Sequence, residues 1–396
     1  MKQCSLFYLI VLSLLFSCSN GDILKEDITV ISTSSDESYE LSVEEAKKMV
    51  YDFVRSSVTK SDRTIRIVGQ KKTEYSIQTS VKTRSGESIG GNVPVYEFFT
   101  ENEGKSGFAL VVADKRIQKV LAYSSYGSLN DTVFNLPLKF FVQTIPDCLK
   151  NDLEEAYTYT KDTDVLTKAD DPTKESFRHY CNPPVTWGQG SPYNNKVTYS
   201  CPNGDPKYGG KAPAGCVAVA LAQLMAYHKQ PSSFNWNLLL SSPIVSQNDS
   251  ELRRNEIARL MFDIGDKVSM IYDCDGSGSN IYSAEAALRG YGYSTKGVRS
   301  YNTDYICENI LNNKPVYIRG VCDKGGHAWL ITGWEHLVTL NPNNQYETND
   351  YFRMNWGWDG SSNGSYYWKS NQLASFQPTG RSSAYEFNRS LEFIYR

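Results

Sequence analysis

Cys216 is the residue whose surroundings most clearly favour covalent chemistry. Ala212-Pro213-Ala214-Gly215 precedes it, and residues 217–227 are apolar apart from Gln223. This run predicts a helix that is buried on every face and begins at the cysteine. Free N–H groups at a helix N-terminus stabilise negative charge, so the thiol there is expected to have a lowered pKa and to become a nucleophilic thiolate. The alternative is a small cysteine that only packs the start of the helix.

A nucleophilic cysteine needs a general base, which is usually histidine. The chain has four histidines, namely His179, His228, His327 and His336. His228 lies about 18 Å along the predicted helix from Cys216, which is out of reach. His179 is near a charged linker, and His336 is in a polar stretch. His327 starts a predicted strand after the turn 323–326, where two glycines let another backbone approach closely. By elimination, His327 is the best candidate base.

Such a pair also needs a group that orients the imidazole and a donor for an oxyanion. Asn355 follows a predicted strand at 351–354 and could accept a hydrogen bond from the imidazole, with Trp356 shielding that bond. Gln189 lies upstream of Cys216, and its amide could donate to an oxyanion together with the Cys216 N–H. Taken singly, Asn355-Trp356 could be an aromatic turn and Gln189 part of a surface loop.

These residues together resemble the streptopain family of bacterial papain-like cysteine proteases. The resemblance rests on four motifs and two upstream stretches: Trp187-x-Gln189-x-x-Pro192-Tyr193-Asn194, Gly215-Cys216-Val217-Ala218, Gly325-Gly326-His327-Ala328, Asn355-Trp356-Gly357-Trp358, residues 107–116 and residues 120–124. It implies an α+β fold in which a central buried helix packs on an antiparallel sheet, preceded by a small α+β propeptide domain. It also implies that Cys216 is the nucleophile, His327 the general base and acid, and Gln189 an oxyanion-hole donor. Asn355 and Trp356 both remain candidates for the third position.

The N-terminus is expected to direct export. Residues 6–16 form an apolar run, which is shorter than the roughly 20 residues that span a bilayer and fits a signal peptide over 1–17. Leu15-Phe16-Ser17-Cys18 resembles a lipobox, in which Cys18 would be lipidated. The prediction is therefore an outer-membrane or cell-surface lipoprotein. Ordinary cleavage near Ser17 is the alternative.

Two domains are expected after a tether at 18–39. A capping box at Ser42–Glu45 predicts a helix over 43–57, followed by strands at 64–68, 93–100, 107–113 and 120–124 and a helix over 139–157. Residues 160–176 are rich in charge and predict an exposed linker that proteases cut. The expected domains are an inhibitory propeptide at 40–168 and a catalytic domain at 169–396, which a cut would release from the lipid.

The composition of the chain limits the classes of partner and cofactor that it is expected to bind. The 396 residues carry a formal net charge of -3, which gives no electrostatic footprint for nucleic acid. The nine cysteines form no CxxC or zinc spacing, and no cofactor or metal is expected. Residues 273–278 resemble a calcium loop only faintly, because Ala284 stands where a bidentate glutamate is needed; they predict a flexible loop beside the cleft. Six of the cysteines lie between residues 181 and 322. If one of them must stay reduced as a nucleophile, the other five cannot all pair, so a dense disulfide framework is not expected.

The expected partners are protein or peptide substrates, the chain's own propeptide as an intramolecular inhibitor, and a membrane reached through Cys18. Two other classes remain open from the residues alone. A Cys–His amidase or transglutaminase-type acyltransferase would use the same pair of side chains with a different acyl acceptor. A non-catalytic binding lipoprotein would keep Cys216 merely packed.

Overall fold

The computed structural model describes residues 39–56, 65–82, 88–130, 135–162, 175–322, 325–340, 346–367 and 390–394. The expected signal peptide, Cys18 and most of the tether lie outside these residues, as do residues 163–174 of the expected linker and part of the 323–326 turn. Among the described residues, no helix has the length and apolar character needed to cross a membrane.

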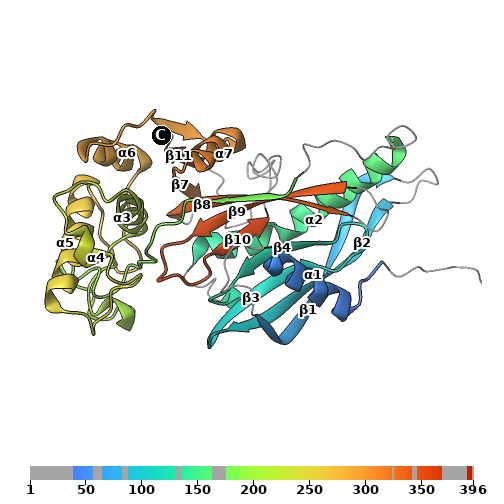
Figure 1. The fold of residues 1–396 in the computed structure, drawn as a ribbon, viewed down its shortest axis with the longest axis horizontal. Helices are drawn as coiled ribbons and strands as arrows, with labels where there is room; N and C mark the ends of the chain where they lie inside the picture. Colours follow the sequence, from blue (N-terminus) through green and yellow to red (C-terminus); the bar gives the residue numbers. More distant parts are fainter. Residues whose placement is uncertain are drawn as a thin grey trace, which may run out of the picture. The chain divides into compact units, whose positions relative to one another are not determined.

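The N-terminal half is an antiparallel sheet with a helix on each face (Figure 1). Its elements are α1 (Val43–Arg55), β1 (Arg66–Lys82), β2 (Ser88–Asn102), β3 (Lys105–Val112), β4 (Lys119–Ser124) and α2 (Leu136–Asp162). Phe53 of α1 contacts the ring of Tyr123, whereas Phe141 of α2 contacts Tyr366. Tyr366 pairs with Ala122, the neighbour of Tyr123, so the two helices lie on opposite faces of the sheet.

The sequence predicts most of these elements. α1 begins with the expected capping box of Ser42 and Glu45. β1 is much longer than the strand expected at 64–68, because it pairs with β2 along nearly its whole length and so extends through polar residues. α2 continues to Asp162, past the first residues of the expected linker.

The C-terminal half contains a mainly helical part and a strand-rich part. Its elements are β5 (Phe177–Tyr180), the short 3-10 helix η3 (Pro206–Tyr208), α3 (Cys216–His228), α4 (Trp236–Leu239), α5 (Glu251–Lys267), α6 (Ile281–Gly290), β6 (Val298–Ser300), α7 (Thr303–Leu311), β7 (Val316–Cys322), β8 (Gly325–Leu340), β9 (Tyr346–Asn355), β10 (Gly364–Tyr367) and β11 (Ser390–Ile394). α3 packs against α5, α6, β7 and β8. Its residues 217–226 are all buried, as the apolar run predicts.

One sheet runs through both halves of the described chain. Its order is β1-β2-β3-β4-β10-β9-β8-β7-β11-β6, with β5 paired to β8. The two halves meet where β4 pairs with β10, Tyr123 opposite Ser365. Gly364 is needed there, since a Cβ would lie 2.1 Å from the Tyr123 carbonyl oxygen. This junction was not predicted from the sequence.

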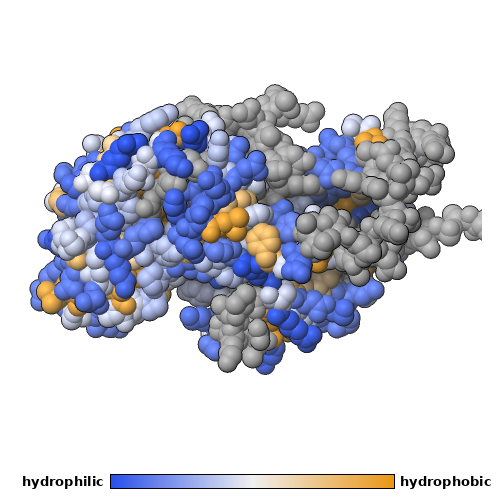
Figure 2. Space-filling view, turned by 45° about the horizontal axis from the view of Figure 1, so that its top comes forward, coloured by the Kyte–Doolittle hydropathy of each residue, from blue (hydrophilic) through white to orange (hydrophobic). Residues whose placement is uncertain are grey.

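The strand predicted to start at His327 is β8, which begins two residues earlier, at Gly325. It continues through His336 because β9 pairs with it up to Leu340, and β5 pairs with it from Gly333 to His336. Its buried Glu335 is matched by Arg178 of β5, with Nε and Oε2 3.0 Å apart. On the face shown in Figure 2, hydrophilic residues dominate and hydrophobic surface occurs in small separate patches.

Candidate active site

Cys216 lies at the first position of α3, as predicted, and its thiol is free and half-buried. The preceding Gly215 has φ of 95°, a conformation that side chains other than glycine rarely adopt. A Cβ there would also lie 2.8 Å from the Cε of Met270 and 3.1 Å from the carbonyl oxygen of Ser277. Glycine before the cysteine is therefore required both by backbone conformation and by space.

The electrostatics of the thiol differ from expectation. Burial raises the pKa of Cys216, although the backbone N–H groups of Ala328 and Val217 and the charge of Arg319 act in the opposite direction. The prediction of a lowered pKa is therefore wrong for this structure, because the loss of hydration outweighs the helix N-terminus. Ala328 directly follows His327, so the same contact places the thiol beside the strand that carries the candidate base.

His327 is buried near the start of β8 and is oriented by a backbone group. Its Nε2 lies 3.0 Å from the carbonyl oxygen of Trp356. A carbonyl can only accept, so Nε2 carries the proton and Nδ1 keeps a lone pair, as a general base requires. The imidazole is nearly parallel to the rings of Trp358 and Trp329, with centroids 5.8 and 6.2 Å away.

The charge state of this histidine is set by its surroundings. Burial lowers the pKa of His327 to about 4, against the opposing effect of the Trp356 carbonyl. At neutral pH the imidazole is therefore neutral. No hydrogen bond or ion pair joins Cys216 to His327 among the described residues. Burial thus favours a neutral thiol and a neutral imidazole over an ion pair.

Asn355 makes no hydrogen bond to His327 among the described residues. Its Nδ2 donates to Oε1 of Gln223 at 2.8 Å, and its Oδ1 accepts from Gln223 Nε2 at 3.3 Å and from the Gly357 N–H at 3.2 Å. Gln223 is the polar residue inside the apolar run of α3 and is fully buried, so its amide requires a partner. Asn355 as the orienting residue is therefore corrected in favour of the Trp356 carbonyl. The isolated glutamine in the run was the signal that sequence reasoning missed.

Trp356 is itself held firmly. Its N–H donates to Asn363 Oδ1 at 2.9 Å, and its Nε1 donates to the Ser362 carbonyl at 2.9 Å and to the Tyr366 hydroxyl at 3.2 Å. The same segment meets the N-terminal half, because Ser362 N donates to Tyr126 O at 2.8 Å and Ser124 Oγ donates to Asn363 O at 2.7 Å. The N-terminal half therefore contacts the loop that orients His327.

The backbone of Gln189 is hydrogen-bonded to the segment that leads into Cys216. Its carbonyl accepts from the N–H of Ala214, two residues before Cys216, at 2.9 Å. The side chain is 5% exposed, and its carboxamide makes no hydrogen bond to the described residues. A buried amide donor without a protein partner, next to a nucleophile, is suited to binding an oxyanion.

Comparisons with known proteins indicate the class of protein to which this chain is similar. Residues 187–367 match the model of the Peptidase C10 family, and residues 38–147 match that of the Spi protease inhibitor. The chain is similar to the streptopain family, and these matches indicate a cysteine peptidase that carries an inhibitory propeptide domain.

Individual relatives agree with this assignment. Streptopain of Streptococcus pyogenes is 25% identical over 372 residues, which cover 83% of this chain and 85% of streptopain. Thiol protease/hemagglutinin PrtT of Porphyromonas gingivalis is 27% identical over 311 residues, 68% of this chain and 33% of PrtT. A mutant fragment of prointerpain A from Prevotella intermedia has a similar fold, with a TM-score of 0.51 and 20% identity over 82% of this chain and 98% of the fragment. The predicted α+β fold is confirmed.

The raised thiol pKa leads to a prediction for the uncut precursor. Alkylation of Cys216 by iodoacetamide should be slow at neutral pH and rise about tenfold per pH unit into the alkaline range, since only the thiolate reacts. Mass spectrometry of the Cys216 peptide from full-length protein measures the rate, and Cys216→Ala identifies the signal. A rate that stays constant between acid and neutral pH would instead indicate a thiolate–imidazolium pair.

Proposed function

We propose that this chain is the exported zymogen of a cysteine endopeptidase that acts through Cys216 and His327. The proposal rests on the arrangement around α3. It combines a free thiol at the helix start, an imidazole whose Nδ1 is left unprotonated, and a Gln189 carboxamide that makes no hydrogen bond among the described residues. Each supplies one requirement of acyl transfer.

In the proposed reaction, the proton of the thiol passes to Nδ1 of His327 as the sulfur attacks a peptide carbonyl. Nε2 of Gln189 and the Cys216 N–H donate to the oxyanion. His327 then protonates the leaving amine, and an acyl-enzyme forms. Water that gives its proton to His327 releases the acid and restores the thiol. The carbonyl of Trp356 keeps Nε2 protonated throughout, so one nitrogen faces the reaction.

We further propose residues 40–168 as the propeptide and 169–396 as the catalytic domain, with the activating cut within 160–176. Contacts from Ser124 and Tyr126 to the segment after Trp356 support a role of the N-terminal half in keeping the site silent. Removal of this half would hydrate the pair and favour the charged forms. Export through residues 1–17 and lipidation of Cys18 would hold the precursor on the outer membrane or cell surface until the cut.

Maturation of purified residues 19–396 tests the function. We expect the wild type to shorten within 160–176 and then to digest casein, while Cys216→Ala stays intact and inert. Cys307→Ala, which removes a buried free thiol from α7, is the control and should behave as the wild type. If both wild type and Cys216→Ala stay intact, trypsin is added to make the cut. A wild-type protein cut in this way that still cannot digest casein would refute the proposal.

The same proteins, expressed with residues 1–18, test the anchor. We expect Cys216→Ala to remain in the membrane fraction and the processed wild-type domain to appear in the medium. A processed domain that stays bound to the membrane would contradict release by cleavage.

A further inference from the structure

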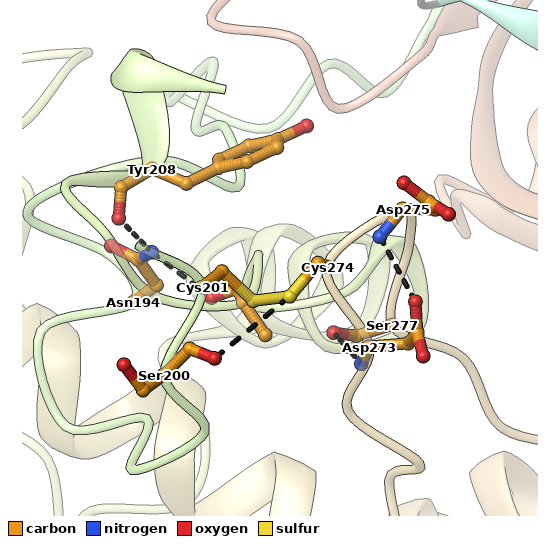
Figure 3. The surroundings of a disulfide bond; sticks show 9 residues. Asn194, Ser200, Cys201, Tyr208, Asp273, Cys274, Asp275 and Ser277 are labelled. Atoms are coloured by element: carbon orange, nitrogen blue, oxygen red, sulfur yellow. Dashed lines mark hydrogen bonds between the residues drawn. A yellow bond between two sulfur atoms is a disulfide. The ribbon is translucent and has the colours of Figure 1, made fainter. Parts of the chain in front are cut away.

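Two small hairpins beside the candidate site are joined by a disulfide that the sequence alone does not predict. The first hairpin, residues 200–211, closes with a bridge between Ser200 and Lys211 and leads directly to Cys216. The second, residues 271–278, closes with a bridge between Ile271 and Gly278. Cys201 of the first is bonded to Cys274 of the second, 73 positions apart (Figure 3). The segment expected to be a flexible loop is thus cross-linked.

The 200–211 hairpin touches the Gln189 segment. The carbonyl of Lys207 accepts from the Ser191 N–H at 3.2 Å. A Cβ on Gly190 would lie 2.7 Å from that carbonyl oxygen. The position of the hairpin therefore limits where the segment after Gln189 can lie.

The same hairpin reaches the His327 side of the site. The Nζ of Lys207 lies 5.4 Å from the ring centre of Trp358, a cation–π distance. Trp358 in turn is the ring that stacks on the imidazole, with an angle of 7° between the planes. Asn194 secures the base of the hairpin by donating to the carbonyls of Tyr208 and Ala212 at 2.8 and 3.0 Å (Figure 3).

The 271–278 hairpin supports the nucleophile from another direction. The Ser277 carbonyl and the neighbouring Met270 pack against Gly215, the residue before Cys216. Apolar contact between the hairpins is slight, since the cluster there is Val197, Cys201 and Ala212 with partly buried Tyr272 and Cys274. So little apolar burial contributes little to holding the hairpins together, and the disulfide joins them covalently.

We propose that the Cys201–Cys274 disulfide is a positioning cross-link of the active site, so that full activity requires this pair oxidised while Cys216 is reduced. The proposal rests on the function proposed above. A dithiol such as dithiothreitol opens the bond: its two thiols supply two electrons and two protons, Cys201 and Cys274 become thiols, and the reagent becomes a cyclic disulfide. Cys274 is half-exposed, which gives the reagent access.

The test compares the processed forms of wild type, the double variant Cys201→Ser/Cys274→Ser and the control Cys307→Ala, without added dithiol. Each rate is divided by the amount of enzyme whose Cys216 iodoacetamide can alkylate, so that only molecules with a reduced thiol are counted. We expect kcat of the double variant to fall about tenfold to a hundredfold, as for a small misplacement of reacting groups, with a much smaller change in KM. The control should match the wild type. A double variant with wild-type kcat per alkylated Cys216 would overturn the proposal, even if its melting temperature fell.

A second measurement tests the proposal on the wild type, in case the double variant does not fold. Wild-type enzyme is titrated with dithiothreitol while mass spectrometry follows the Cys201–Cys274 bond. We expect activity to fall in step with the opening of the bond and to return on reoxidation. Undiminished activity with the bond fully open would refute the cross-link's role. Failure of the proposed function is distinguishable, because the wild type would then be inactive even with the bond closed and Cys216 reduced.

Discussion

Replacing His327 by alanine is expected to lower kcat/KM by at least about 10³-fold, because the same imidazole must take the thiol proton and protonate the leaving amine. Burial keeps this imidazole neutral, with a pKa of about 4. The Trp356 carbonyl fixes which nitrogen is available. His228 cannot take over, since it is at the far end of α3 from Cys216. The measurement is hydrolysis of a fluorogenic peptide by enzyme cut with trypsin, so that failed self-processing does not enter the result.

His336→Ala is the matched control. It removes an imidazole from the same strand, nine residues further along the chain, where Nδ1 lies 2.9 Å from Asp350 Oδ1. We expect its kcat/KM to stay close to the wild-type value. Equal losses in the two variants would mean that His327 supports the strand rather than the reaction.

Glu335→Gln is expected to destabilise the precursor by about 3–5 kcal/mol, the usual effect of removing one partner of a buried ion pair. The Glu335 and Arg178 side chains are 1% and 4% exposed, so loss of the carboxylate leaves a buried guanidinium without its counter-charge. Glu335 also accepts from the Tyr180 hydroxyl at 2.9 Å and from Ser365 Oγ. It therefore joins β5, β8 and β10. Urea unfolding in the Cys216→Ala background, which cannot process itself, measures the change.

Glu101→Gln provides the comparison. Glu101 pairs with Arg66 at 2.7 Å between β2 and β1, but their side chains are 39% and 72% exposed. Exposed pairs contribute at most about 1 kcal/mol, so this variant should unfold close to the parent protein. If both variants lose similar stability, burial is not what makes the Glu335–Arg178 pair important.

Part of the candidate site follows from local sequence. The apolar run after Cys216 can be buried only as a helix within a core, and α3 is that helix. The turn and its glycines before His327 predict that a strand starts there, and β8 is that strand. The capping box at Ser42 likewise predicts the start of α1. In each case the signal lies within a few residues and reflects the periodicity or capping of a single element.

The tertiary structure decided how those elements contact one another and which environment each site residue has. The choice between Asn355 and the Trp356 carbonyl depended on Gln223, a buried amide on another element that takes up the Asn355 side chain. The raised pKa of the Cys216 thiol depended on how completely the surrounding chain removes water. The pairing of Cys201 with Cys274 and of β4 with β10 joins segments far apart in sequence. Hydration, buried hydrogen bonding and strand pairing are properties of the packed molecule, so local sequence identifies candidate residues but not the environment that sets their chemistry.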